Sequence, residues 1–143
     1  MRLLGKIFVG FLVLAFLGML FDDTPSLNNR LGEAIMTGKA TDAQWEEYNK
    51  VLNHEAKLCV VVAANAKAKA GAWNPDGIAI DYTSAYAADD YVASNNRNPN
   101  PSYSGSVALS GTNAFGATVK SRVEGFGTMR LEKDGSKYVI RCR

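Results

Sequence analysis

The chain has 143 residues, of which 47% are hydrophobic and 21% charged, and these proportions are ordinary for a globular protein. Its formal net charge is +2, and residues 31–143 carry 13 Lys or Arg against 12 Asp or Glu. Because dedicated nucleic-acid-binding domains carry a strong basic excess, this balance argues against nucleic acid as a partner. The length fits one domain and one additional short segment.

The first segment of the chain is predicted to be a membrane anchor. Residues 7–21 form an unbroken run of apolar residues and glycine, with two basic residues before it and two acidic residues after it. No small-x-small cleavage site follows the run, so we predict an uncleaved single-pass transmembrane helix within residues 1–22; a cleaved signal peptide is the alternative. The basic residues favour a cytoplasmic N-terminus, which places the rest of the chain on the periplasmic, extracytoplasmic side of the inner membrane.

Residues 23–40 are predicted to form a linker with a short helix, and residues 41–143 the folded domain. The linker is polar and rich in turn-forming residues, and residues 31–36 can form one or two helical turns. Thr41 and Gln44 form a capping box, which predicts the start of a long helix that runs to about residue 70. Apolar residues then recur at spacings of three and four, which indicates an amphipathic helix. They are Trp45, Tyr48, Leu52, Ala56, Cys59, Ala63 and Ala66.

After the turn residues 74–77 the hydrophobic period changes to two, which predicts β-strands. The alternating segments are 78–81, 103–109, 119–132 and 138–142. Between the first two segments, residues 83–102 are less regular, and the Asn- and Pro-rich stretch 94–101 predicts an exposed loop. We therefore expect an α+β fold, in which an N-terminal transmembrane helix precedes one long amphipathic helix packed on an antiparallel sheet of about four strands.

The two cysteines are predicted to form a disulfide bond. Cys59 lies on the apolar face of the long helix and Cys142 on the apolar face of the last strand, so both side chains point into the layer between helix and sheet. An exported domain meets an oxidising environment, in which such a bond persists. The alternative is a pair of free, buried cysteines that act as small hydrophobic residues.

The sequence contains no pattern typical of a metal site or of a nucleophilic catalytic site. His54 is the single histidine and the cysteines are far apart, so no metal-ligand spacing exists, and we expect neither a metal nor a cofactor. His54 is also the only histidine that could serve as a base, and burial would suppress the thiolate of Cys59. Gly125 and Gly127 lack the third glycine of a nucleotide-binding loop, and inside a strand they indicate a bulge or a close helix contact.

Carboxylates and tyrosines gather in the stretch that begins with the first strand. Asp81, Asp89 and Asp90 are candidates for the paired acids of a glycosidase, and solvated loop acids are the simpler interpretation. Tyrosine and asparagine are typical recognition residues, so the same stretch is a candidate recognition loop, with a merely variable surface loop as the alternative. The residues of this loop are Tyr82, Tyr86, Tyr91, Asn95, Asn96, Arg97, Asn98 and Tyr103.

A second candidate surface is basic. Residues 120–143 carry seven Lys or Arg against three acidic residues. On the outward face of the longest predicted strand, Lys120, Arg122 and Arg130 accompany the apolar side chain of Phe126. Such a face suits anionic lipid headgroups or an acidic partner, and a solvated sheet face is the alternative.

From Cys59 onward the chain resembles a group of small exported or membrane-tethered bacterial and phage domains of unknown function. The resemblance rests on the helix-borne Cys59, an Asn-Pro turn at position 74 and an Asn-x-Phe-Gly turn from Asn113 to Gly116, and it covers the last 85 residues. In that group the second cysteine follows soon after the Asn-x-Phe-Gly turn, whereas here it is Cys142. The resemblance implies no activity, and it implies that Asn113 and Gly116 shape a turn.

These observations favour a non-enzymatic, membrane-anchored interaction module. We expect an accessory subunit of an envelope complex or a phage-encoded exclusion factor, with the membrane and another envelope protein as partners. A homo-oligomer is compatible with the sequence. The alternatives are a structural subunit of a surface filament and a small envelope hydrolase that uses Asp81 and Asp89.

Overall fold

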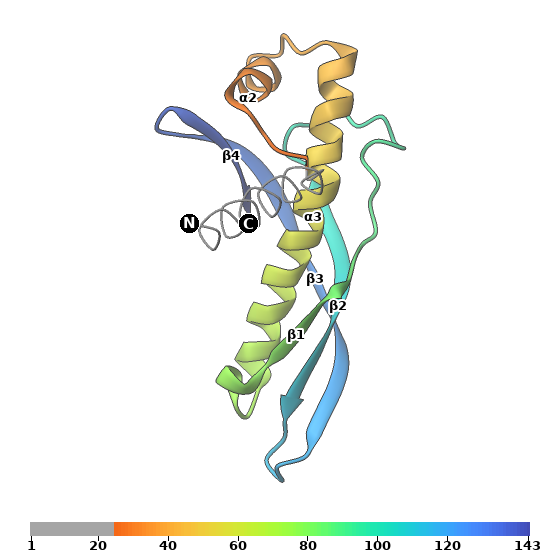
Figure 1. The fold of residues 1–143 in the computed structure, drawn as a ribbon, viewed down its shortest axis with the longest axis vertical. Helices are drawn as coiled ribbons and strands as arrows, with labels where there is room; N and C mark the ends of the chain where they lie inside the picture. The colour runs from red at the N-terminus through yellow and green to blue at the C-terminus, as the bar shows by residue number, and fades with distance from the viewer. Residues whose placement is uncertain (1–24) are drawn as a thin grey trace, which may run out of the picture.

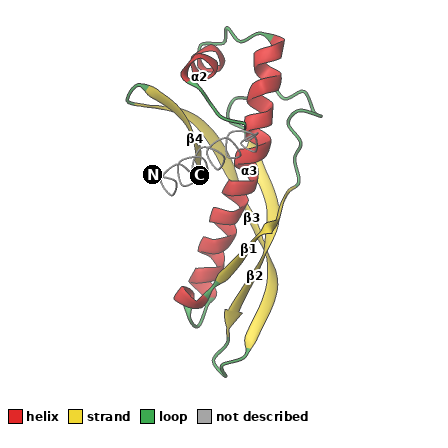
Figure 2. Cartoon of the chain, in the orientation of Figure 1, coloured by secondary structure: helices red, strands yellow, loops and turns green. Residues whose placement is uncertain are grey.

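The computed structural model describes residues 25–143 and has one long helix packed against a four-stranded sheet (Figures 1 and 2). The helices are α2 (Asn29–Met36), α3 (Asp42–Gly71) and the 3₁₀ turn η1 (Pro75–Gly77). The strands are β1 (Ala79–Ala87), β2 (Ser102–Thr112), β3 (Thr118–Asp134) and β4 (Lys137–Cys142), and neighbours pair antiparallel in the order β1-β2-β3-β4. The predicted α+β arrangement of the domain is confirmed.

The predicted anchor within residues 1–22 lies outside the described residues. Within residues 25–143, no helix combines the length and the apolar character that crossing a membrane requires. The described residues comprise most of the predicted linker and the whole of the predicted folded domain.

Helix α3 begins at the predicted capping box. The Thr41 hydroxyl accepts a hydrogen bond from the Gln44 amide at 3.3 Å, and the Gln44 side chain accepts one from the Thr41 amide at 2.9 Å. This exchange satisfies two backbone donors that a helix start leaves free. The helix has 30 residues, so it is about 45 Å long and runs most of the length of the molecule (Figure 1).

Glycine lets helix and sheet approach closely near the middle of α3. A methyl group at the buried Gly125 of β3 would collide with the main-chain carbonyl of Val60 in α3. No residue with a side chain fits between the two backbones at this position. The prediction that the strand glycines mark a close helix contact is confirmed for Gly125.

Strand β1 is longer than the sequence pattern predicts. Residues 83–87, expected to be irregular, belong to β1, and only the pairing register with β2 is interrupted, between Asp81 and Tyr86. Inside the interruption the Asp81 carboxylate accepts hydrogen bonds from the amide and hydroxyl of Thr83, at 3.2 and 2.6 Å. The irregularity breaks the period of two, which explains why hydrophobic alternation did not reveal this part of the strand.

The interior divides into two clusters along α3. The larger cluster, which we call the proximal core, lies between α2, the first two-thirds of α3, and β3 and β4. Its buried residues include Leu31, Ile35, Tyr48, Leu52, Cys59, Tyr91, Tyr103, Met129 and Leu131. The smaller cluster, which we call the distal core, has four buried residues, Val61, Ala64, Val107 and Leu109.

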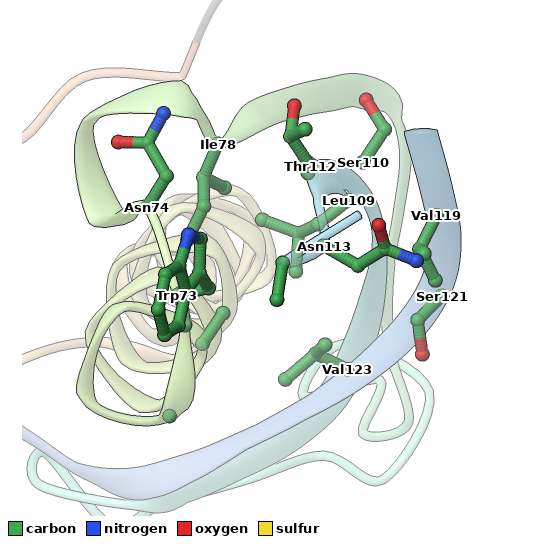
Figure 3. A pocket seen from close by; sticks show the side chains of 15 residues that line it. Trp73, Asn74, Ile78, Leu109, Ser110, Thr112, Asn113, Val119, Ser121 and Val123 are labelled. Carbon is green, nitrogen blue, oxygen red and sulfur yellow. The ribbon is translucent and has the colours of Figure 1, made fainter. Parts of the chain in front are cut away.

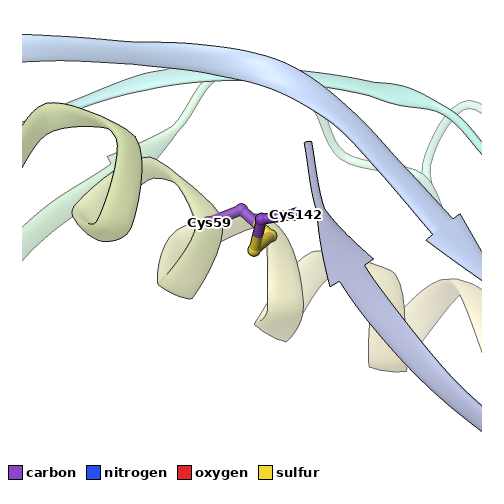
Figure 4. The surroundings of a disulfide bond; sticks show 2 residues. All are labelled: Cys59 and Cys142. Carbon is purple, nitrogen blue, oxygen red and sulfur yellow. A yellow bond between two sulfur atoms is a disulfide. The ribbon is translucent and has the colours of Figure 1, made fainter. Parts of the chain in front are cut away.

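The disulfide bond between Cys59 and Cys142 is present, as predicted (Figure 4). It joins the middle of α3 to the end of β4, with the two Cα atoms 5.4 Å apart and a sequence separation of 83 residues. Both cysteines belong to the proximal core or pack against it. A cross-link over a loop of this length stabilises a fold by about 4 kcal/mol on the chain-entropy model.

Candidate interaction surfaces

Two tyrosines of the predicted recognition loop are core residues. Tyr91 is 5% exposed and Tyr103 is 4% exposed. The Tyr91 hydroxyl donates a hydrogen bond to the carbonyl of Ser102 at 2.6 Å, and burial, with a smaller contribution from Asp89, raises the pKa of Tyr91 to about 12. Burial also raises the pKa of Tyr103. Their side chains are therefore withdrawn from the surface that a partner would touch.

The asparagines of the predicted loop fasten it to α3. The side chain of Asn96 donates a hydrogen bond to the buried Asn49 at 3.1 Å, and Asn49 donates one back to the main chain of Asn96 at 2.9 Å. Arg97 pairs with Asp42 at 3.1 Å and lies over the ring of Trp45. The remaining two shape the backbone: Asn95 adopts a positive φ, and Asn98 accepts a hydrogen bond from the amide of Asn100.

The exposed part of the predicted recognition region is on β1. Tyr82 is 66% exposed and Tyr86 is 57% exposed. Tyr82 lies within the register interruption of this edge strand, and Tyr86 lies at the end of the interruption. The structure thus separates the eight predicted residues into two surface tyrosines, two core tyrosines and four residues that order the loop.

One arginine of the predicted basic face is held by hydrogen bonds to neighbouring strands. Arg122 donates hydrogen bonds to the Ser106 hydroxyl at 2.8 Å and to the Ser84 carbonyl at 2.7 Å, so it braces three strands. Lys120 and Arg130 are exposed, as is Phe126, which is 72% exposed.

Beyond this face, two further cations, one in β4 and one directly after it, are paired. Arg141 and Arg143 form ion pairs with Glu132 at 3.0 and 2.7 Å. Through the hydrogen bond from Arg143 and the surrounding positive charge, they lower the pKa of Glu132. Two of the basic residues of 120–143 are therefore paired by acidic residues of the same segment.

The predicted acidic residues lie in hydrogen-bonded turns. Asp81 accepts its hydrogen bonds from Thr83, and Asp90 accepts hydrogen bonds from the Ala93 amide and the Asn53 side chain. The bonds to Asp90 lower its pKa. Asp89 lies exposed in the loop after β1. Within residues 25–143, no group of three His, Cys, Asp or Glu side chains is placed to hold a metal ion.

An open apolar groove lies at the end of the molecule opposite α2. It has a volume of about 440 Å³ and lies between the end of α3 with η1 on one side and the β2–β3 hairpin on the other (Figures 1 and 3). The side chains that define it are those of Ala68, Trp73, Ile78, Leu109, Val119 and Val123. Figure 3 shows Trp73 on one side, Val119 on the other and Leu109 between them. We call this part of the molecule, residues 65–80 and 109–121, the distal end.

Small residues in the last turns of α3 explain why the groove is open. Residues 62–72 contain six alanines and no side chain larger than valine apart from Asn65 and two lysines. Where α3 packs on the proximal core, Tyr48 and Leu52 fill the space between helix and sheet. Alanine cannot fill that space at the distal end, so the sheet side chains remain accessible.

Two large apolar residues that line the groove, Trp73 and Val119, are exposed, and so is Phe115 in the adjoining hairpin turn, which does not line it. Phe115 is 95% exposed, Trp73 is 75% exposed and Val119 is 49% exposed. The sequence reading missed Trp73 as a functional candidate, because it follows the helix and belongs to no periodic pattern. The available signal was an aromatic residue inside a turn motif, since Trp73 precedes Asn74-Pro75 and Phe115 lies within 113–116.

The hairpin turn holds Phe115 at its apex. The side-chain oxygen of Asn113 accepts hydrogen bonds from the amides of Phe115 and Ala117, each at 3.0 Å. Gly116 has φ +80°, a conformation that glycine adopts without strain. Asn113 and Gly116 therefore shape the turn, in the way that the sequence resemblance implies.

The distal end carries a positive charge. Lys67, Lys69 and Lys120 are exposed, and Asp76 is the one acidic residue among residues 65–80 and 109–121. The formal charge of this end is therefore +2. Among the described residues none of these three lysines forms an ion pair, although Asp81 lines a neighbouring pocket together with Lys120.

No protein-family model, no curated protein sequence and no solved structure matches the chain.

Proposed function

We propose that the protein is a non-enzymatic, membrane-anchored interaction module whose docking surface is the distal end. The observation that carries the proposal is the open apolar groove together with Trp73, Phe115 and Val119 exposed around it. Soluble monomeric domains rarely expose several large apolar side chains side by side, and such patches mark surfaces that meet another molecule.

The apolar segment at residues 7–21 supports a location at the membrane. A module held there by its N-terminus meets other envelope components at a high effective concentration, so even a small docking surface suffices for a stable contact. This setting suits the accessory subunit or the phage-encoded exclusion factor that the sequence analysis describes.

Site-specific photocrosslinking of the full chain in cell membranes tests the proposal. A photoreactive phenylalanine analogue replaces Trp73, and the matched control carries it at Val62, which is 59% exposed on α3 outside the distal end. We expect adducts with a protein or with lipid from position 73 and none from position 62. Equal yields at both positions, or no adduct at either, would contradict the proposal.

The filament alternative stays a prediction, and it requires contacts between many copies of the chain. The apolar face of α3 cannot form the core of such a fibre, because the chain's own sheet covers that face. A filament would therefore have to assemble through other surfaces. The size of the detergent-extracted protein separates the alternatives, because a filament subunit yields an open series of polymers and an accessory module a defined small complex.

The hydrolase alternative also stays a prediction. It assigns the chemistry to Asp81 and Asp89. Asp81→Asn and Asp89→Asn would abolish such an activity while leaving the photocrosslinks from position 73 unchanged.

A further inference from the structure

We propose that the component met by the distal end is an anionic lipid surface, into which Trp73 and Phe115 insert while the neighbouring lysines contact the headgroups. This inference rests on the proposed function, because it names the partner of the same surface.

The aromatic side chains are arranged for insertion. Phe115 is at the apex of the β2–β3 hairpin, where the Asn113 side chain fixes the turn, and it projects away from the domain with 95% of its surface exposed. Trp73 follows the end of α3 and lies across the groove from Val119 (Figure 3). Projecting aromatic side chains of this kind sit favourably at the level of lipid headgroups.

The charge of the distal end fits an anionic surface. Lys67 and Lys69 flank the groove residue Ala68 in the last turns of α3, and Lys120 follows Val119 in β3. Surface potentials of anionic membranes attract such residues by roughly fivefold in affinity per lysine. The same like charges disfavour a second copy of this end as the occupant, because a twofold axis would bring the lysines of both copies together.

The place where the chain enters the domain is compatible with docking on the membrane that holds the anchor. Pro25 lines a cavity with His54 and Tyr138, beside the middle of α3. From His54 to Gly71 the helix extends about 26 Å, and the four residues that lead from Phe21 to Pro25 span at most about 14 Å. If the apolar run is embedded in the bilayer up to Phe21, Pro25 lies within about 14 Å of the membrane surface. The distal end can then reach that surface when the axis of α3 is closer to parallel with the membrane than to perpendicular.

Fluorescence quenching by brominated lipids tests this inference in the full chain. The protein has two tryptophans, so Trp45→Phe leaves Trp73 as the only reporter, and Trp73→Phe leaves Trp45. Trp45 is at the opposite end of α3, against Tyr48, and serves as the matched control. Each variant is reconstituted into vesicles of brominated phosphatidylcholine, with or without phosphatidylglycerol.

We expect strong quenching of Trp73 in vesicles that contain phosphatidylglycerol, weaker quenching without it or at high salt, and little quenching of Trp45. In the Trp45→Phe background, K67Q, K69Q and K120Q together should remove most of the Trp73 quenching. The charge-matched control K39Q, K57Q and K137Q, which alters three exposed lysines elsewhere, should leave it unchanged.

The outcomes separate this inference from the proposed function. If Trp73 is not quenched but position 73 crosslinks to a protein, the lipid inference is overturned and the proposed function stands. If Trp73 is not quenched and position 73 yields no adduct, both are overturned. Equal quenching of Trp45 and Trp73 would also overturn the inference, because the contact would then not belong to the distal end.

Discussion

The two ends of α3 pack on one continuous sheet by different means. At the proximal end, tyrosine and leucine side chains fill the core, and the Tyr48 hydroxyl and the Asn49 amide bind the loop after β1. At the distal end, four small or medium-sized buried residues form the core, and the groove beyond them stays open. Both ends have the same topology, so the open groove at the distal end results from the small alanine side chains in the last turns of α3.

Removing the disulfide bond in the proximal half should cause the largest change in stability. Cys59→Ala with Cys142→Ala should lower the free energy of unfolding by about 4 kcal/mol, because the cross-link no longer limits the entropy of the unfolded chain. Denaturant unfolding of the oxidised protein and of the double variant measures the change. An equal stability of the two proteins would mean that the proximal half does not depend on its cross-link.

Two asparagines of α3 form a matched pair for the comparison. Asn49 exchanges hydrogen bonds with Asn96, so Asn49→Ala should cost about 2 kcal/mol. Asn65 is near the distal end, and its side-chain oxygen is buried without a hydrogen-bond partner among the described residues. Asn65→Ala should therefore be nearly neutral or slightly stabilising. Thermal unfolding measures both changes in stability. Similar losses of stability from the two substitutions would contradict the proposed difference between the two ends.

The two tryptophans sharpen the contrast in function. Trp73 is 75% exposed, so Trp73→Ala should change the free energy of unfolding by less than about 0.5 kcal/mol and yet abolish docking. Trp45 packs against Tyr48 and under Arg97, so Trp45→Ala should destabilise the fold by about 1 kcal/mol and leave docking intact. Unfolding curves check the stabilities. Hydrogen–deuterium exchange of residues 109–121 in anionic membranes checks docking, because the anchor would hold both variants at the membrane whether or not the distal end docks. A large loss of stability in Trp73→Ala would mean that Trp73 serves the fold.

The smallest effect concerns the ion pairs of β3 and β4. The hydrogen bond from Arg143 and the charges around it lower the pKa of Glu132 in the folded protein. A carboxyl whose pKa is depressed by folding adds stability above its unfolded pKa, and this contribution disappears as the pH falls through the folded pKa. Glu132→Gln should therefore flatten the acid side of the stability profile slightly, without effect on docking. An unchanged acid limb would show that these exposed pairs contribute nothing measurable.

Local signals predicted the parts of the fold that depend on neighbours in sequence. The capping box at Thr41 placed the start of α3, and period-two alternation placed β2, β3 and β4. The cysteine pair followed from the faces that Cys59 and Cys142 occupy. Each of these features depends on the spacing of residues within one helix or one strand, so the sequence alone was enough to predict it.

The remaining features depend on contacts between distant segments. The burial of Tyr91 arises because the loop after β1 folds back on α3, and Tyr103 is buried because it lies in β2 and belongs to the core formed with α3; composition reveals neither. The last part of β1 was missed because its pairing is interrupted between Asp81 and Tyr86. The groove forms only when Trp73 and Val119 are brought to one end, so the sequence reading named basic and tyrosine-rich surfaces and overlooked the apolar one.

Hydrogen–deuterium exchange of the full chain tests the central claim most directly, by comparing the protein in detergent with the protein in membranes that contain anionic lipid. The account predicts that backbone amides in residues 72–78 and 109–121 become protected in the membrane, while the loop at residues 88–101 exchanges at the same rate in both. Protection of the loop with no change at the distal end would contradict the assignment of the docking surface.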